Sequence, residues 1–155
     1  MEIERDFKEL LELLNSHRVE YLLVGAYALA FHGAPRFTGD LDVFVKPDSA
    51  NSRRLIAALT DFGFGSVGLS AEDFEKPDQV VQLGVPPVRI DLITGISGVS
   101  WDEAVDGSVN AELDGLPVRF IGRNHFVINK RAAGRKKDLA DLEALGEESE
   151  DKGKT

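Results

Sequence analysis

Two aspartates, two residues apart, are the part of this sequence best suited to chemistry. Asp40 and Asp42 begin a six-residue run in which polar and apolar residues alternate. Side chains two apart in a strand point to the same face. Both carboxylates would therefore stand together, while Leu41 and Val43 enter a core. Two carboxylates that close raise each other's pKa unless a cation lies between them, and carboxylate oxygens are ligands that Mg²⁺ and Mn²⁺ prefer.

A third acidic residue separates this pattern from an ordinary acidic sheet surface, where such pairs are common. Asp91 lies in a second apolar run, residues 88–93, where an unpaired charge is costly. It is either a solvated aspartate of an edge strand or a third carboxylate beside Asp40 and Asp42.

A glycine follows the continuous apolar run of residues 21–24, which is typical of a buried strand. Gly25 and Ala26 then open a helix of small residues that ends before Gly33. A turn from strand to helix can present backbone N–H groups to a phosphate. The alternative is a plain turn that needs glycine for steric reasons alone.

Several cations and one hydroxyl accompany these residues. Arg36 precedes Asp40 by four residues and can pair with the carboxylates or meet a phosphate. Thr38 can hydrogen-bond to local backbone or to an acidic side chain. Lys130, Arg135 and Lys137 lie in a basic segment, which is either a phosphate-binding surface or a solvated helix with ion pairs.

Composition restricts the class of protein. The chain has 155 residues, a net charge of −9 and no cysteine. Disulfides and thiolate metal sites are excluded, and a broadly basic nucleic-acid surface is disfavoured. No apolar run reaches the ~18 residues of a membrane helix, and the first residues lack the layout of a signal peptide. We expect a cytoplasmic protein without membrane contact.

The periodicity predicts elements that alternate between helix and strand. We expect an amphipathic helix over about residues 3–17, strands at 21–24 and 40–45, and a helix starting at Asp48 or Ser49. Hairpins are expected at 79–93 and 108–121, a short capped helix at 100–104, and two C-terminal helices broken at Gly134. We expect one domain over residues 1–146 and a charged, disordered tail over 147–155.

These motifs together resemble the DNA polymerase beta-like nucleotidyltransferase superfamily. Its signature is a hydrophobic residue with Gly-Gly or Gly-Ser, then Asp-hydrophobic-Asp or Glu, then a third Asp. Gly25-Ala26, Asp40-Leu41-Asp42 and Asp91 follow that order. Residues 36–42 and 129–141 most resemble small stand-alone proteins related to abortive-infection, or toxin–antitoxin, nucleotidyltransferases. The likeness covers roughly residues 1–146.

The resemblance implies an α/β (α+β) fold, the minimal nucleotidyltransferase arrangement of a mixed sheet with helices mainly on one face. It implies a transferase that moves a nucleotide from a nucleoside triphosphate to a hydroxyl of a tRNA or protein, with an antitoxin protein as a further expected partner. Mg²⁺ or Mn²⁺ would lie at Asp40, Asp42 and Asp91, which would be both catalytic and metal-binding. The implied nucleotide-binding residues are Gly25, Ala26, Arg36, Thr38, Lys130, Arg135 and Lys137.

One residue departs from the signature. The second turn residue is commonly Gly or Ser, and here it is Ala26, which keeps the backbone N–H but adds no hydroxyl. Two alternatives therefore stay open: a nucleotide-binding module with little turnover, and a protein-interaction domain in which the aspartates are surface charge.

Overall fold

Six strands form one mixed sheet in the computed structural model, which describes residues 3–35, 38–64, 68–85 and 88–147. The sheet order is β3-β4-β2-β1-β6-β5. The strands are β1 Tyr21–Val24, β2 Asp40–Val45, β3 Val80–Val85, β4 Val88–Ile93, β5 Val109–Leu113 and β6 Leu116–Phe120. The α-helices are α1 Arg5–Ser16, α2 Gly25–Phe31, α3 Ser49–Leu59, α4 Trp101–Asp106, α5 Arg123–Ala133 and α6 Lys136–Ala144.

The centre of the sheet joins segments that are far apart in the sequence. β1 pairs antiparallel with β2, and Val24 lies opposite Asp42. β2 pairs in parallel with β4, and the register sets Asp42 beside Asp91. The hairpins β3–β4 and β5–β6 extend the sheet on either side. Both predicted hairpins are thereby confirmed.

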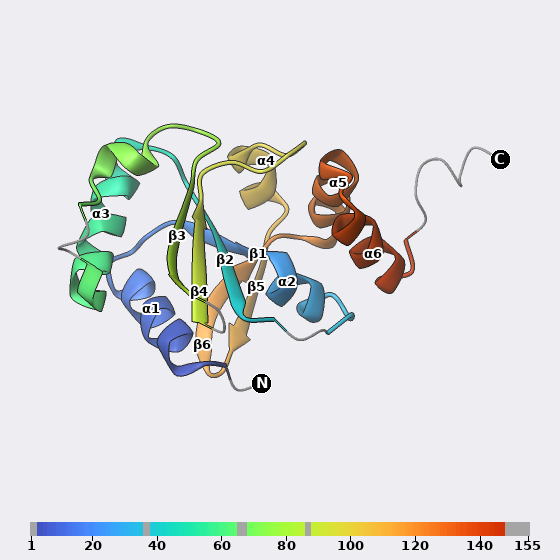
Figure 1. Ribbon diagram of the computed structural model, residues 1–155, viewed down its shortest axis with the longest axis horizontal. Coiled ribbons are helices and arrows are strands. Elements are labelled where there is room, and N and C mark those ends of the chain that lie inside the picture. The colour runs from blue at the N-terminus through green and yellow to red at the C-terminus, as the bar shows by residue number, and fades with distance from the viewer. Residues whose placement is uncertain (1–2, 36–37, 65–67, 86–87, 148–155) are drawn as a thin grey trace.

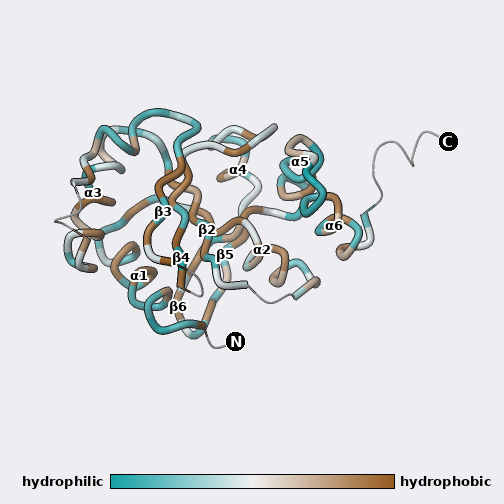
Figure 2. Tube along the Cα trace, viewed as in Figure 1, coloured by the Kyte–Doolittle hydropathy of each residue, from teal (hydrophilic) through white to brown (hydrophobic). Residues whose placement is uncertain are grey.

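One face of the sheet is closed by α1 and α3, which lie on the same side in Figure 1. Leu41, Val43 and Val45 of β2 are fully buried in one core with Phe7 and Leu10 of α1. Figure 2 shows hydrophobic residues along the central strands, as this burial requires. The polar members of β2 face the opposite side. The expected α+β fold with a mixed sheet is confirmed.

Local sequence signals explain most helix ends. The carboxylate of Asp48 accepts a hydrogen bond from the Asn51 N–H at 2.7 Å and so caps α3. Ser100 forms a capping box at the start of α4. Gly134 takes a left-handed conformation with φ 64° between α5 and α6, as the predicted break requires.

The segment after α3 is partly helical. Residues Thr60–Phe64 continue α3 as one widened helical turn, η1, and Gly63 breaks it with φ 108°. A second short helix, η2 Ala71–Phe74, opens with a capping box at Ser70. Residues 148–155 lie outside the described chain, so the expected tail stays a prediction. Within the described residues, no helix is both long and apolar enough to cross a membrane.

Candidate active site

The parallel pairing of β2 with β4 brings the three predicted carboxylates together. Asp42 lies directly beside Asp91, and Asp40 lies beside Arg89 on the neighbouring strand. Asp91 is 8% exposed. Alternation along both strands places these side chains on the face opposite the α1 and α3 core. The predicted grouping of Asp40, Asp42 and Asp91 is therefore present in the fold.

Gly25 is required by its contact with the Asp42 carboxylate. Its φ is +66°, and a Cβ built on it would overlap the Asp42 side chain. Gly25 also starts α2, so the turn from β1 presses its backbone against the acidic side of the site. The neighbouring Ala26 is buried. Because the Ala26 side chain is buried, backbone atoms form the surface of this turn.

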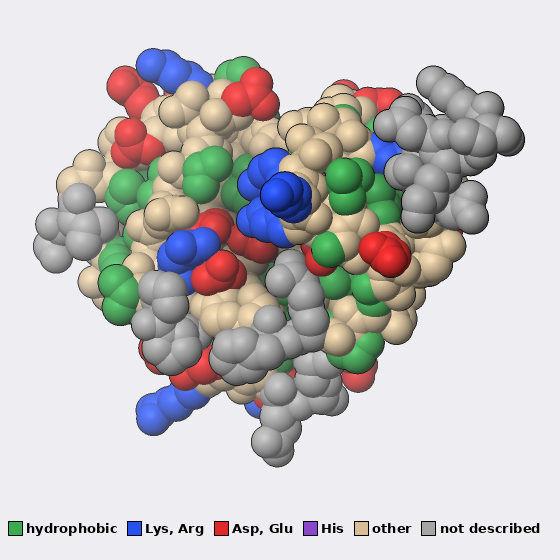
Figure 3. All heavy atoms as spheres, turned by 45° about the vertical axis from the view of Figure 1, so that its right-hand side comes forward, with side chains coloured by type: hydrophobic (Ala, Val, Ile, Leu, Met, Phe, Trp, Pro, Cys, Tyr) green, Lys and Arg blue, Asp and Glu red, His purple; other side chains and the backbone are tan. Residues whose placement is uncertain are grey.

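These residues line a cleft of about 660 Å³. That volume is within the range of small-molecule sites. Figure 3 shows acidic side chains gathered in a hollow, with Lys and Arg side chains on either side of it. The cleft contains the predicted residues Gly25, Ala26, Thr38, Asp40, Asp42, Asp91, Lys130, Arg135 and Lys137. Arg36 lies outside the described residues.

The Asp42 carboxyl is the most perturbed group of the cleft. Burial, then the adjacent charge of Asp91 and a hydrogen bond with it, then the charge of Asp40, raise the pKa of Asp42 to about 7. Lys130 acts in the opposite direction and lowers it. Near neutral pH, Asp42 and Asp91 therefore share a site that either holds a proton or attracts a cation.

Arg89 is a site residue that the sequence interpretation did not single out. Its guanidinium Nη2 lies 2.9 Å from Oδ2 of Asp40, and its Nε lies 3.3 Å from Oδ1 of Asp91. It thus bridges two of the three carboxylates. The alternation of β4 places Arg89 on the face of Asp91, and this signal was sufficient to include Arg89 in the site.

The donor set fits a divalent cation, although it is not a closed metal site. Among the described residues, no group of three His, Cys, Asp or Glu side chains is arranged to hold a metal. Arg89 forms ion pairs with both Asp40 and Asp91. Oδ1 of Asp91 is nevertheless buried without a hydrogen-bond partner within the described chain. A buried, unsatisfied carboxylate oxygen beside a second carboxylate suits a hard cation.

Lys130 lies on the opposite wall of the cleft and is buried. Its Nζ lies 3.2 Å from Oδ1 of Asp138 and 3.1 Å from Oδ2 of Asp141. The ammonium also stands 5.3 Å from the centre of the Phe126 ring. Ion pairs of α5 with α6 therefore position Lys130. The alternative that this segment is only a solvated helix does not describe Lys130, Asp138 and Asp141, which are all buried.

Arg135 completes this wall from the break between the two helices. Its Nε donates to Oδ2 of Asp138 at 2.7 Å, while most of the side chain stays exposed. Burial alone would raise the pKa of Asp138, but hydrogen bonds from Arg135 and Lys130 outweigh it, so the pKa is lowered. Asp138 is thus an anion that holds two cations at the cleft.

Thr38 and Lys137, two further predicted residues of the cleft, differ in the contacts of their polar groups. The Thr38 hydroxyl accepts from the Asp40 N–H at 3.0 Å, which is the local backbone contact that one interpretation predicted. Lys137 is exposed at the start of α6 and lines the cleft. Thr38 therefore shapes the turn into β2, and Lys137 supplies an exposed charge at the rim.

A family model described as "Nucleotidyl transferase of unknown function (DUF2204)" matches residues 3–155. Among curated proteins, no sequence matches this chain. Solved structures do match its fold. A Thermotoga maritima protein assigned as a nucleotidyltransferase has a TM-score of 0.58 and 12% identity, covering 92% of this chain and 89% of that chain.

Two enzymes acting on antibiotics are similar in fold to the same degree. The lincosamide antibiotic adenylyltransferase LnuA, solved with lincomycin, has a TM-score of 0.56 and 13% identity, covering 93% of this chain and 96% of that chain. ANT(2″)-Ia, solved with adenylyl-2″-tobramycin, has a TM-score of 0.57 and 13% identity, covering 90% of this chain and 84% of that chain. At these identities the likeness concerns the fold alone.

Proposed function

Because the chain belongs to the DUF2204 family of nucleotidyl transferases, we propose that its cleft transfers a nucleotide from a nucleoside triphosphate to a hydroxyl group. The observation that carries this proposal is the convergence of Asp40, Asp42 and Asp91 in a cleft whose opposite wall is basic. Carboxylates on one side and cations on the other match a metal-bound triphosphate better than any uncharged ligand.

The reaction forms a bond from the acceptor oxygen to the α-phosphorus and breaks the bond from the α-phosphorus to the leaving pyrophosphate. We assign to Asp91 the role of receiving the acceptor's proton; in support, its Oδ1 contacts Arg89 Nε at 3.3 Å but accepts no hydrogen bond from the described residues. Asp40 and Asp42 would hold Mg²⁺ or Mn²⁺ together with Asp91. Such an ion, when bound, neutralises charge on the phosphoryl oxygens. Asp40 can bind the ion only if its ion pair with Arg89 breaks.

The β- and γ-phosphates would lie between the turn at Gly25 and the wall formed by α5 and α6. Gly25 and Ala26 offer backbone N–H groups, which Ala26 provides as well as a serine would. A lysine has three N–H donors. Among the described residues, Asp138 and Asp141 engage the ammonium of Lys130, which leaves its third donor for phosphate. Arg135 and Lys137 add charge at the rim.

The acceptor we propose is a macromolecular hydroxyl, on a tRNA or on a protein. The basic side chains at the rim support an acceptor that carries phosphate, and the net charge of −9 disfavours a long duplex. If the chain is the toxin of a toxin–antitoxin pair, an antitoxin protein is a further partner. Since LnuA and ANT(2″)-Ia share the fold, small antibiotics belong among the acceptors tested.

The proposal is tested by thermal unfolding with Mg²⁺ and each of the four common nucleoside triphosphates. A ligand that binds only the folded state raises stability by about 2.7 kcal/mol at a hundred times its dissociation constant. We expect a metal-dependent shift in the wild type that is lost in Asp40→Asn/Asp42→Asn and kept in the surface variant Asp102→Asn. A shift of equal size in the double variant would place the nucleotide elsewhere.

A second candidate function is nucleotide binding with little turnover. The ion pairs of Arg89 favour it, because a guanidinium that stays on Asp40 and Asp91 leaves an incomplete metal site. Incubation with nucleoside triphosphate labelled at the α-phosphate, in the presence of total tRNA, protein extract and antibiotics, separates the two candidates. Transfer of label to any acceptor supports the enzyme, whereas bound but unconsumed nucleotide supports the binding module.

A further inference from the structure

β3 is an unprotected edge of the sheet. It is the first strand in the sheet order, so no strand formed by the described residues lies along one side of its backbone. Exposed edges in natural proteins are usually blunted by charged residues or proline. The strand Val80–Val85 contains neither, and Val80 and Val85 are 58% and 74% exposed. The other edge strand, β5, carries Glu112.

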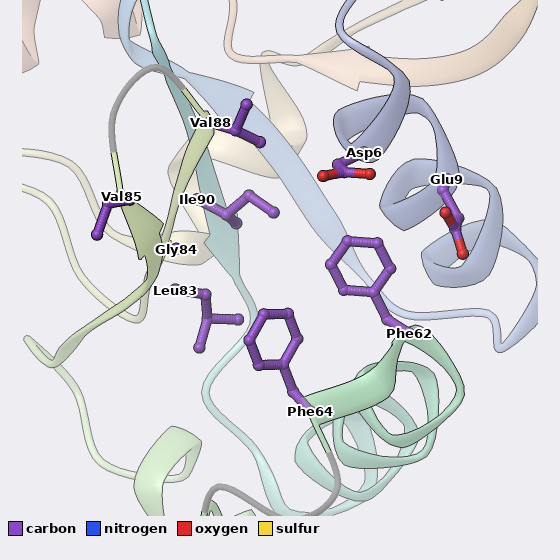
Figure 4. Close-up of a pocket in the computed structure, with 9 residues that line it drawn as sticks. All are labelled: Asp6, Glu9, Phe62, Phe64, Leu83, Gly84, Val85, Val88 and Ile90. Atoms are coloured by element: carbon purple, nitrogen blue, oxygen red, sulfur yellow. The ribbon is translucent and has the colours of Figure 1, made fainter.

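An apolar groove runs beside this edge, on the face opposite the acidic cleft. It measures about 520 Å³. Figure 4 shows its residues: Leu83, Val88 and Ile90 come from the hairpin, Phe62 and Phe64 from the turn after α3, and Asp6 and Glu9 from α1. We call β3 together with this lining the β3 groove.

The two aromatic rings are presented to the groove by a backbone kink. Gly63 has φ +108°, a conformation that side chains with a Cβ rarely adopt. The kink lets Phe62 and Phe64 lie next to one another, with ring centres 5.5 Å apart. Both rings are only half-buried. Two aromatic faces thus remain available for a further apolar side chain.

The charge of the groove selects among possible occupants. Asp6 and Glu9 are exposed, and within the described residues neither side chain has an ion-pair partner. A second copy of this chain would bring an identical acidic wall and a further net charge of −9. Like charges so close disfavour association. A segment that carries lysine or arginine complements both the charge and the apolar floor.

We propose that the β3 groove docks an extended, basic and apolar segment of a partner protein by strand addition. The partner's backbone pairs with the free edge of β3, and every second side chain enters the groove. An apolar side chain packs against Phe62 and Phe64, and a lysine or arginine two residues away reaches Asp6 and Glu9. This surface does not depend on the proposed catalytic function.

Selection from a displayed library of random octapeptides on the full chain tests the proposal. We expect enriched peptides with apolar and basic residues on the same face of a strand. The best peptide is then synthesised with a fluorescent label, and its affinity is measured by anisotropy. N-methylation of alternate backbone amides should weaken binding at least tenfold, because it removes edge pairing while keeping the side chains.

Protein variants test the acidic wall separately. Asp6→Asn/Glu9→Gln should weaken binding of the peptide about three- to tenfold, as expected for two exposed ion pairs. The charge-matched control Asp102→Asn/Glu143→Gln, at exposed positions on α4 and α6, should change affinity less than twofold. Both variants should unfold at the wild-type temperature.

Three results would overturn the proposal. The first is a library that yields no alternating basic and apolar consensus. The second is a peptide that binds equally well when N-methylated, which would assign the groove to a small amphiphile. The third is a wild type that sediments as a dimer and becomes a monomer in Val85→Lys, which would assign the edge to a second copy.

Discussion

The raised pKa of Asp42 makes the stability of this protein depend on pH in a direction opposite to that of an ordinary carboxylate. Its pKa rises from 3.8 to about 7, chiefly through burial and the charge of Asp91. Between these values the folded state keeps a proton that the unfolded state has lost. The free energy of unfolding therefore falls as pH rises, by about 1.36 kcal/mol per pH unit. Over the whole interval the loss is about 4 kcal/mol.

The substitution Asp42→Asn removes this pH-dependent contribution to the free energy of unfolding. The free energy of unfolding of the variant, relative to wild type, should increase by about 2.3 kcal/mol between pH 5 and pH 7, because the slope halves as Asp42 reaches its folded-state pKa of about 7. It should level off above pH 8, where Asp42 is ionised in both states. Other carboxylates titrate in both proteins, so they largely cancel in the difference.

Urea unfolding at half-unit steps from pH 5 to 8, in buffer free of divalent cations, measures this difference. Asp102→Asn, an exposed carboxylate at the start of α4, serves as the control and should run parallel to wild type. If the difference between Asp42→Asn and wild type stays constant within about 0.5 kcal/mol, a limit set by the extrapolation, the reasoning about the paired carboxylates is refuted.

Three further variants have expected outcomes. In urea unfolding, Gly25→Ala should lower the free energy of unfolding by more than Gly115→Ala does. The Gly115 variant should lose about 1 kcal/mol, the cost of a left-handed backbone in open space. Equal losses in the two variants would contradict the contact between Gly25 and Asp42. Without metal, Arg89→Met should lower the free energy of unfolding by about 1–2 kcal/mol. In a thermal scan, Mg²⁺ should stabilise this variant more than it stabilises the wild type. Weaker stabilisation by Mg²⁺ would show that Arg89 does not compete with the ion. Lys130→Met should cost about 3 kcal/mol in urea unfolding, because the buried carboxylates of Asp138 and Asp141 each lose an ion pair with it. A loss below about 1 kcal/mol would mean that these pairs are solvated.

The local pattern of residues predicts much of the fold. Alternation in residues 40–45 and 88–93 indicates which side chains of β2 and β4 enter the core with α1 and α3, although Phe44 and Asp91 on the other face are buried as well. Capping residues such as Ser70 and Ser100 mark helix starts, and Gly134 marks a helix break. These signals are local, since each depends on neighbours within four residues.

The pairing of strands that are far apart in the sequence cannot be predicted from the local pattern of residues. Nothing in the sequence states that β4 lies in parallel beside β2, and that register alone sets Asp42 against Asp91. Alternation along β4 places Arg89 on the face of Asp91, but the ion pair of Arg89 with Asp40, 49 positions away, depends on the same long-range pairing. The family resemblance supplied the grouping of the aspartates that the local pattern left open.

The basic segment shows a different limit. Lys130 and Asp138 are eight residues apart and lie on different helices, so no helical spacing rule connects them. Their burial depends on the left-handed turn at Gly134, which folds α6 back onto α5. The pattern predicted both helices and the break, but not the ion pairs that form across it.

The measurement that tests the central claim most directly is a titration with Mn²⁺ followed by electron paramagnetic resonance, with and without nucleoside triphosphate. Our account predicts an ion that binds the wild type, binds more tightly with nucleotide, and is lost in both Asp42→Asn and Asp91→Asn but not in Asp102→Asn. Equal Mn²⁺ binding by the wild type and both cleft variants would contradict a metal–nucleotide site at these carboxylates.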